Sequence, residues 1–414
     1  MPKIAVIGDL HLNLVAYNKI YDEEFIGLPF RNGDFMRSLR SMVDDCIDNI
    51  KPDLVVITGD VYDYYEPTND VRGFFSKQLE RFSEQKIPVI ILIGNHDVCK
   101  KHHALKDIQE LKLKHIKVIE EPKILKYKGM QLLLFPYSLD IERGIISIKD
   151  EFLKFKETFK EKDDGTEAVF FGHFGVKGAS LSEYNIKRGK DVKVKGDFVN
   201  DSDKDVSCAD LDDFGAKHFI LGDYHKTQVL NTKNCYAMYT GSIEKTDFSE
   251  IDQKKGFMVY DSEAEDDVKF GKCKFIEYKG CRPMLELSGN LTEMQTQFAK
   301  QNCKNLQKAI VKFKFEGTRE ESTTFYLGLR KFKKEITEKI NPIYMIHEKK
   351  ITNPELEEEC TELQKEVDKK GSIEGEDVLA ILKEMIEDRE KNKDEQEILK
   401  TLITDIYNKN RGTN

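Results

Sequence analysis

The chain has 414 residues, of which 39% are hydrophobic, so it can bury a sizeable core and is expected to form two or three domains. No apolar run approaches the ~20 residues that a membrane-spanning helix needs, and we expect no secretory signal before the first predicted strand at Lys3. The eight cysteines are scattered without a CxxC pair, which excludes a zinc knuckle and is typical of free thiols in a reducing cytoplasm.

The net charge of −9 is concentrated near the end of the chain. Residues 351–414 contain 18 acidic and 10 basic residues, a net charge of −8, which leaves −1 for the other 350 residues. Overall charge therefore does not predict a protein that grips DNA by itself. If DNA binds, we expect metal ions and a partner protein to supply much of the attraction for phosphate.

Five short apolar runs in the first 225 residues predict buried strands, alternating with helical stretches as in an α/β domain. They cover residues 3–11, 52–63, 88–97, 167–173 and 217–225. Each run ends in Gly followed by a metal-ligand type of residue. Gly lets the backbone turn sharply at the carboxyl end of a strand, where open α/β folds place their sites. We therefore expect the five strand ends to converge.

The pattern changes after a hairpin-like segment at 234–261 and an acidic stretch at 262–267. Strands are predicted at 268–280 and 308–317, and helices at 291–302 and 324–340. These elements predict a smaller α+β domain that ends near Lys350. We accordingly expect three parts, at residues 1–262, 268–350 and 351–414.

The last part is expected to contain a charged linker and two amphipathic helices. Their apolar faces comprise Val378, Leu379, Ile381, Leu382, Met385 and Ile386 in the first, and Ile398, Leu399, Leu402, Ile403 and Ile406 in the second. Such stripes either pack on their own domain or bind a partner, and we favour partner binding.

The residues that follow the five strands form one chemical set. They are Asp9 and His11, then Asp60 and Asp63, then Asn95, His96 and Asp97, then His173, and finally Asp223 and His225. Oxygen and nitrogen ligands without thiolates suit Mn²⁺, Fe²⁺, Zn²⁺ or Mg²⁺. A carboxylate such as Asp60 can bridge two ions about 3.5–4 Å apart. His96 adjoins a proposed ligand, so it can contact the substrate and act as a general acid or stabilise charge.

Taken singly, several of these residues have ordinary structural explanations. Asp9 alone could cap a helix, and His11 and His225 alone could be satisfied buried histidines. Asp63 and Asp97 could each orient a histidine or serve only as turn residues.

Two basic stretches remain outside this set. His102 and His103, in the stretch 99–103, are expected on a solvated surface, with a DNA phosphate contact as the less favoured alternative. The basic run 187–196 is expected to be a solvated loop, although it could also touch a DNA backbone.

The ordered motifs D-x-H, GD-x-x-D, GNHD, GH and G-x-x-H resemble those of the calcineurin-like metallophosphoesterases across residues 3–225. The stretch 239–261, with its GS, FSE and KKGF segments, is similar to the end of the nuclease domain in the SbcD/Mre11 family. The resemblance implies a four-layer α/β/β/α sandwich, a DNA-facing cap at 268–350 and helices at 351–414 that bind a coiled-coil SMC-like ATPase. The short chain and acidic tail are most similar to the nuclease subunits of large tailed phages.

The resemblance also implies a two-metal centre that uses Mn²⁺ or Mg²⁺, with His96 as the catalytic histidine. One ion would be held by Asp9, His11, Asp60 and His225, and the other by Asp60, Asn95, His173 and Asp223. The family usually has GHxH at the fifth strand, whereas this chain has GDYH, so Asp223 replaces a neutral imidazole and is expected to alter metal preference.

The function implied is that of a DNA exonuclease and endonuclease subunit in double-strand-break repair, active as a homodimer in the cytoplasm of a bacterium or of a phage-infected host. Two alternatives remain open. One is a phosphatase or phosphodiesterase for small substrates. The other is a non-catalytic DNA-end scaffold whose metal site has decayed, and only the GDYH departure favours it.

Overall fold

The computed structural model describes residues 2–14, 16–17, 20–181, 191–194, 197–200, 206–317 and 319–351. The chain divides into two compact units, Met1–Arg282 and Pro283–Asn414. The predicted tail helices and most of the basic run 187–196 lie outside the described residues. No helix among the described residues combines the length and apolarity that crossing a membrane requires.

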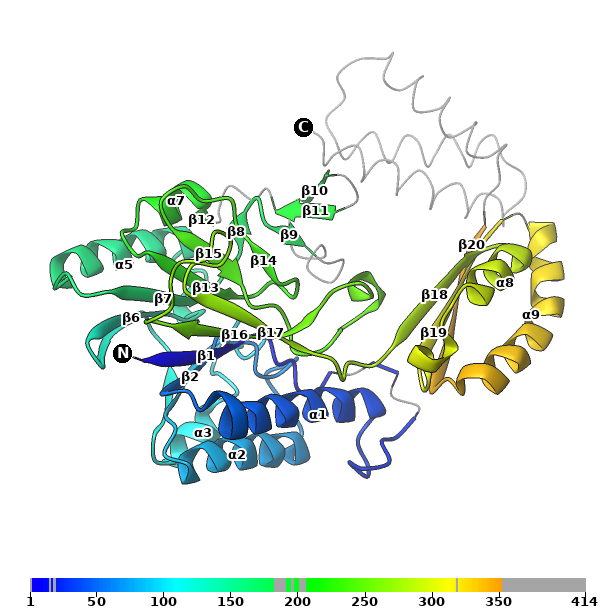
Figure 1. Cartoon of the computed structure of the whole chain (residues 1–414), viewed down its shortest axis with the longest axis horizontal. Helices are drawn as coiled ribbons and strands as arrows, with labels where there is room; N and C mark the ends of the chain where they lie inside the picture. The colour runs from blue at the N-terminus through cyan, green and yellow to red at the C-terminus, as the bar shows by residue number, and fades with distance from the viewer. Residues whose placement is uncertain are drawn as a thin grey trace, which may run out of the picture. The chain divides into compact units, whose positions relative to one another are not determined.

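Two six-stranded sheets form the centre of the first unit (Figure 1). The first sheet has the order β17 (Cys273–Tyr278), β16 (Lys255–Asp261), β1 (Lys3–Ile7), β2 (Leu54–Ile57), β3 (Val89–Leu92) and β4 (Ile116–Ile119). Strands β1 to β4 are parallel, whereas β16 and β17 are antiparallel to their neighbours. The carboxyl ends of β1, β2 and β3 therefore lie at one edge of this sheet.

The second sheet repeats this arrangement with a different part of the chain. Its order is β14 (Gln228–Val229), β15 (Tyr236–Tyr239), β13 (His218–Gly222), β7 (Ala168–His173), β6 (Met130–Phe135) and β5 (Lys123–Tyr127). The four central strands are parallel, so the carboxyl ends of β7 and β13 lie together. The five predicted strands are thus all present, three in one sheet and two in the other.

Hydrophobic packing arranges the sheets and helices in four layers. Val6 and Leu54 of the first sheet share a buried cluster with Leu132 and Phe171 of the second, so the sheets pack face to face. Figure 1 shows α1 (Phe30–Asp45), α2 (Asn69–Glu84) and α3 (Lys106–Glu110) outside the first sheet, and α5 (Ile148–Lys162) and α7 (Cys208–Asp212) outside the second. Their apolar faces fill two outer clusters. The predicted α/β/β/α sandwich is confirmed.

Short elements connect these layers. They are η1 (Cys46–Ile50), α4 (Leu139–Glu142), β8 (Val176–Lys177), β9 (Ser180–Leu181), β10 (Asp191–Val194), β11 (Asp197–Asn200), β12 (Val206–Ser207) and η2 (Phe248–Glu250). The segment 234–261 is not the hairpin expected from its sequence, because β15 and β16 lie in different sheets. The chain crosses between the sheets here, which places 240–250 beside the strand ends.

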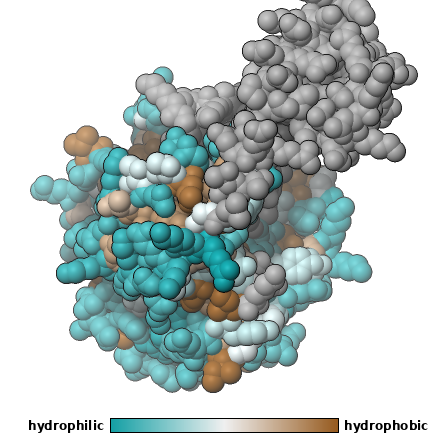
Figure 2. Space-filling model, turned by 90° about the vertical axis from the view of Figure 1, so that its right-hand side faces the viewer, coloured by the Kyte–Doolittle hydropathy of each residue, from teal (hydrophilic) through white to brown (hydrophobic). Residues whose placement is uncertain are grey.

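The second unit is a small α+β domain, as expected. It contains the parallel strands β18 (Met284–Gly289), β19 (Ile310–Gly317) and β20 (Tyr344–Ile351), with α8 (Leu291–Ala299), η3 (Cys303–Leu306) and α9 (Arg319–Ile340). Helix α8 begins where Asn290 and Glu293 form a capping box. Phe313 of β19 packs against Phe332 and Ile336 of α9 in the core. On the face shown in Figure 2, hydrophobic residues lie scattered among hydrophilic ones, which is ordinary for a protein surface.

The boundary between the units differs from the predicted one. We expected the smaller domain to begin at residue 268, but β17 pairs antiparallel with β16 in the first sheet, and the division falls between Arg282 and Pro283. A strand pattern shows that a segment is extended and half buried without showing which strand it pairs with. The acidic stretch at 262–267 is therefore a connection within the first unit.

Candidate metal centre

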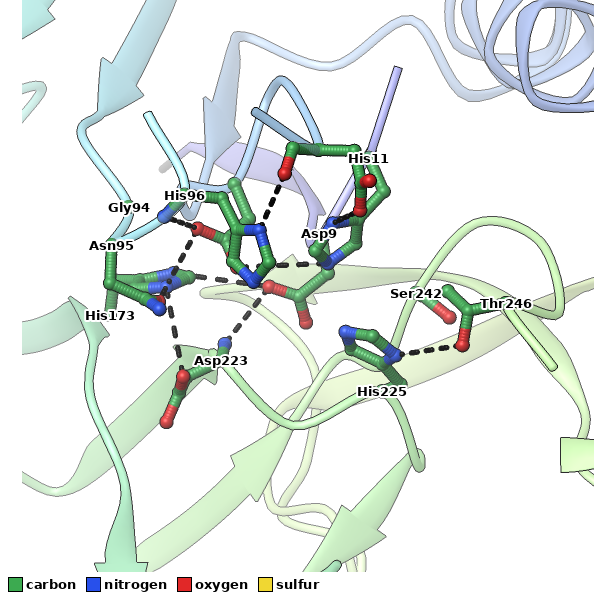
Figure 3. Close-up of polar contacts among 12 residues, drawn as sticks. Asp9, His11, Gly94, Asn95, His96, His173, Asp223, His225, Ser242 and Thr246 are labelled. Atoms are coloured by element: carbon green, nitrogen blue, oxygen red, sulfur yellow. Dashed lines mark hydrogen bonds and ion pairs between the residues drawn. The ribbon is translucent and has the colours of Figure 1, made fainter. Parts of the chain in front are cut away.

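The ends of β1, β2, β3, β7 and β13 converge and bring the predicted ligands together (Figure 3). Asp9, His11, Asp60 and Asp223 adopt positive φ angles of 42°, 40°, 47° and 98°. Residues other than glycine seldom adopt this conformation, and it is costly unless the surrounding structure enforces it. Backbone strain at four predicted ligands marks this strand edge as a functional site.

The glycines that precede these residues act differently from what we expected. We predicted that each would supply a sharp turn, but of the five only Gly59 has a positive φ, of 102°. The others provide space for close approach. A Cβ atom at Gly94 would collide with the main chain and carboxylate of Asp60, and one at Gly222 would lie 2.6 Å from the carbonyl oxygen of Thr58. Glycine is required because the loops of the two sheets meet here.

His173 is the centre of one group of ligand atoms. Its Nδ1 lies 2.7 Å from the carbonyl oxygen of Thr58, to which it must donate. Its Nε2 therefore faces Asn95 Oδ1 at 2.8 Å, Asp60 Oδ1 at 3.3 Å and Asp223 Oδ1 at 4.0 Å. Several electron-pair donors that face one another require a cation or a proton among them. Figure 3 shows Asn95, His173 and Asp223 on one side of the centre.

The pKa values of His173 and Asp60 also indicate that this group of ligand atoms needs a cation. Burial disfavours the charged imidazole, but Asp60, Asp223 and Asp9 outweigh it and raise the pKa of His173 to about 10. Burial likewise opposes ionisation of Asp60, yet His173 and His96 hold its pKa well below the usual value. In the absence of a metal ion, protons on histidine compensate the carboxylates, and a divalent ion would displace them.

A second group of ligand atoms surrounds the other oxygen of Asp60. His11 Nε2 lies 3.6 Å and His96 Nε2 lies 3.8 Å from Asp60 Oδ2. Burial lowers the pKa of His11, but the hydrogen bond to Asp63 and the charge of Asp60 raise it overall, to about 9. The potential ligand atoms fall into two groups, one with His11, Asp60 and His96 and one with Asp9, Asp60 and His173. Asp60 belongs to both, as a bridging carboxylate would.

This grouping differs in detail from the sets that the resemblance implies. Asp9 lies with His173, because Asp9 Oδ1 is 3.8 Å from His173 Nδ1 and accepts the main-chain N–H of Asp223 at 2.9 Å. His96 lies with His11 although we expected it to contact substrate. The other oxygen of Asp9 is fully buried and accepts no hydrogen bond from the described residues. A buried carboxylate oxygen without a partner is costly, so the donor set fits a metal ion.

His225 is positioned by a residue that sequence analysis missed. Its Nδ1 lies 2.8 Å from the buried carboxylate of Glu250 and 3.3 Å from Thr246 Oγ1, and its ring centroid lies 4.5 Å from that of His11. Burial opposes ionisation of Glu250, but Lys255 at 2.8 Å and His225 hold its pKa well below normal. A carboxylate behind an imidazole fixes the ring and leaves Nε2 for a metal. The FSE segment contained this residue, but we used it only as a family marker.

The two uncertain aspartates have different positions. Asp63 Oδ1 lies 3.2 Å from His11 Nδ1, so its contact is with a histidine. Asp97 is buried and accepts main-chain N–H groups of Val61, Tyr62 and Gly94 at 2.9–3.2 Å, so it ties two loops together. Burial, followed by the charge of Asp60, raises the pKa of Asp97 to about 7.

The expectation for the stretch 99–103 was wrong in part. His103 is 1% exposed, with its Nδ1 3.2 Å from the main-chain nitrogen of Leu105 and its Nε2 3.5 Å from Glu120. It is therefore a buried structural histidine rather than part of a solvated surface. Its neighbour His102 is half buried.

Comparison with known proteins identifies the family of this fold and site. Residues 2–226 match the sequence profile of the calcineurin-like phosphoesterases. The chain belongs to this family. The resemblance predicted from the ordered motifs is confirmed, and phosphoesterases of this kind are metal-dependent enzymes, in agreement with the two groups of ligand atoms.

Individual proteins that resemble this chain share only a modest fraction of its sequence. The chain is 24% identical over 272 residues to the SbcD component of the nuclease SbcCD of Staphylococcus epidermidis, covering 63% of this chain and 66% of that protein. It is 31% identical over 123 residues, 29% of each chain, to DNA double-strand break repair protein Mre11 of Sulfurisphaera tokodaii. It is 24% identical over 254 residues to metallophosphoesterase YhaO of Bacillus subtilis, covering 61% and 56%. The match thus spans less than two thirds of the length of each relative.

Proposed function

We propose that this phosphoesterase is a DNA nuclease subunit of the SbcD/Mre11 type, which hydrolyses phosphodiester bonds at DNA ends during double-strand-break repair and recombination. The observation on which the proposal depends is the sharing of Asp60 between two groups of ligand atoms. A shared carboxylate is the usual means of holding two ions close enough to act on one phosphodiester. The similarity to relatives named as a nuclease component and a break-repair protein supports DNA as the substrate.

The ligand sets proposed for the centre are those that the family resemblance implies, with Asp60 shared between them as it is between the two groups of ligand atoms. Asp9, His11, Asp60 and His225 would hold one ion, and Asp60, Asn95, His173 and Asp223 the other. Such ions polarise a phosphoryl oxygen and promote the attack of water on phosphorus. In His173 and His225 the Nδ1 atom is already bound to a protein oxygen, so the Nε2 atom of each ring is oriented in advance for a metal ion. Hard oxygen ligands with imidazoles suit Mn²⁺, with Mg²⁺ as the alternative.

His96 is the proposed catalytic residue. Its Nδ1 lies 2.7 Å from the carbonyl oxygen of Asp63, so Nδ1 donates and the ring is fixed. Its main-chain N–H donates to Asp60 Oδ1 at 2.8 Å. The side chain is 8% exposed, whereas that of His11 is fully buried. His96 is thus less buried than His11, and its Nε2 could protonate a leaving oxygen or stabilise developing charge.

Part of the proposal concerns the predicted tail helices, which lie outside the described residues. We propose that the helices predicted in 351–414 bind a coiled-coil SMC-like ATPase, that the second unit acts as the DNA-facing cap, and that the protein works as a homodimer. Residues 1–350 carry a net charge of only −1 and therefore offer little overall attraction for phosphate. This supports the proposal that a partner protein contributes to DNA binding.

A nuclease assay on double-stranded ends, with Mn²⁺ or Mg²⁺ and with or without the ATPase, tests the proposal. We expect His96→Ala to lose activity by about 10²–10⁴-fold while keeping its metal ions. His115→Ala is a matched control, because His115 is exposed and lies outside the centre. Equal degradation by the parent and His96→Ala would refute the role of His96. Hydrolysis of a nitrophenyl phosphodiester without any on DNA would instead indicate a small-substrate phosphodiesterase, and a metal titration without binding would indicate a scaffold.

A further inference from the structure

Two adjacent tyrosines follow Asp63, whose carboxylate contacts His11 in the candidate metal centre. The ring centroids of Tyr64 and Tyr65 lie 4.2 Å apart, with an angle of 48° between the rings. Tyr65 is half buried and packs against the core of the first unit. Tyr64 is 48% exposed. An exposed ring supported by an anchored one presents an aromatic surface that loses little entropy when a ligand binds, since tyrosine has only two side-chain torsions.

The segment that contains the two tyrosines is held in place at both ends. Before them, the main-chain N–H of Tyr62 donates to the buried carboxylate of Asp97 at 2.9 Å. After them, the guanidinium of Arg72 donates to the carbonyl oxygen of Pro67 at 3.2 Å. The position of the aromatic pair relative to the catalytic loops is therefore fixed by the fold.

This position lies beside the proposed catalytic histidine. The carbonyl oxygen of Asp63 contacts His96 Nδ1 at 2.7 Å, and consecutive Cα atoms are only about 3.8 Å apart. The main chain of Tyr64 therefore begins one residue from the group that orients His96. This adjacency of the main chain is what would allow the ring of Tyr64 to meet the base of a nucleotide whose phosphate is at the centre.

A basic turn lies next to Tyr65. Val98 and His103 form an isolated bridge that closes a short turn directly after Asp97. The turn exposes Lys100 and Lys101. The ring centroid of His102 lies 6.1 Å from that of Tyr65. Proteins commonly bind single-stranded nucleic acids through aromatic rings, on which bases stack, beside cationic side chains, which contact the backbone phosphates.

We propose that Tyr64 stacks on the base of the nucleotide next to the scissile phosphodiester in an unpaired strand, and that Lys100 and Lys101 contact its backbone phosphates. This inference rests on the proposed nuclease function and names its substrate class, a single-stranded or frayed DNA end. A base within a duplex is already stacked and must leave the helix to reach the ring, whereas an unpaired base is available at once. Stacking on tyrosine tolerates every base, so sequence preference should be weak.

The test compares cleavage kinetics of single-stranded oligonucleotides by the full chain, Tyr64→Ala and Tyr64→Phe, under the conditions of the nuclease assay. We expect Tyr64→Ala to raise KM roughly 5- to 150-fold, the range for loss of one stacked base, with little change in kcat. Tyr64→Phe keeps the ring and should resemble the parent. An abasic nucleotide beside the cleaved bond should raise the KM of the parent to that of Tyr64→Ala and leave Tyr64→Ala unchanged.

A matched control and a binding measurement separate this inference from the proposed function. Tyr21→Ala removes an exposed tyrosine, 64% exposed, from the first unit outside the five strand ends and should behave as the parent. A terminal 2-aminopurine in the oligonucleotide should be quenched on binding in EDTA, where hydrolysis does not proceed. Quenching by the parent, absent in Tyr64→Ala, supports the stacking site even if no cleavage is ever observed. Equal KM and equal quenching in the parent and Tyr64→Ala would overturn the inference while leaving the nuclease function intact.

Discussion

Replacement of Glu250 by glutamine tests whether a buried carboxylate positions a metal-binding histidine. In the parent, Glu250 Oε1 lies 2.8 Å from His225 Nδ1, and Oε2 lies 2.8 Å from Lys255 Nζ. All the atoms involved are buried, because the side chains of Glu250 and Lys255 are 0% exposed and that of His225 is 1% exposed. Glutamine has nearly the same shape, so the substitution removes the charge with little change in packing.

Two separate effects are expected. The first is on stability, since Lys255 would become a buried cation without a carboxylate, which costs about 3–5 kcal/mol. The lower end of this range applies here, because Lys255 still donates to the carbonyl oxygen of His225, to Ser242 and to Gln253 at 2.8–3.0 Å. The second effect is on the metal, since loss of the carboxylate behind a ligating histidine typically weakens metal binding about 10- to 100-fold.

Isothermal titration calorimetry with Mn²⁺ and urea denaturation measure the two effects independently. Adding Lys255→Met to Glu250→Gln should recover stability but not metal affinity. Glu244→Gln is a matched control, because Glu244 is buried in the same connection but contacts Ser38 Oγ and the main-chain nitrogen of Arg282. Metal affinity should be unchanged in this control. If Glu250→Gln binds Mn²⁺ as tightly as the parent, His225 is not a ligand oriented by Glu250 and the reasoning fails.

Two further perturbations address other parts of the molecule. Asp223→Ala should weaken Mn²⁺ binding at one of two positions by at least about tenfold, whereas Asp223→His keeps a ligand there; unchanged stoichiometry and affinity in Asp223→Ala would show that this carboxylate holds no ion. For His218, burial lowers the pKa to about 4 despite the opposing charge of Asp266, while an unfolded histidine titrates near about 6.5. The unfolded state therefore binds more protons between these values, and stability should fall by up to about 3 kcal/mol as pH falls through this window. Denaturation at pH 7, 5.5 and 4 should show a shallower loss in His218→Gln, and parallel curves would contradict the assignment.

The strands that position the site were predictable because each is a short apolar run with local limits. All five predicted runs contain a strand, from β1 at Lys3–Ile7 to β13 at His218–Gly222. Their division between two sheets was not predictable from the residues, since a buried strand has the same pattern whatever it pairs with. The same limit explains β17, which was expected in the smaller domain and instead completes the first sheet.

The convergence of the candidate ligand residues was predictable and the residues that support them were not. Asp60 or His173 follows an apolar run and glycine, a signal that is local in sequence. Glu250 lies 25 residues after His225 in a 3₁₀ turn, and only the fold brings their side chains together. A usable signal did exist, because a buried histidine ligand needs a partner for its second nitrogen. Glu250 of the FSE segment is that partner.

Asp223 changes the charge balance of the proposed centre and thereby the importance of contacts outside it. With two divalent ions, the carboxylates of Asp9, Asp60 and Asp223 would leave one net positive charge, whereas a histidine at the last position would leave two. The third carboxylate binds the ions more firmly but reduces their attraction for a phosphodiester anion. A nitrophenyl phosphodiester has no neighbouring backbone phosphates, whereas a DNA strand can also contact the exposed Lys100 and Lys101 beside the tyrosine pair. This chain should therefore favour an oligonucleotide over a nitrophenyl phosphodiester by a wider margin than its own Asp223→His variant does.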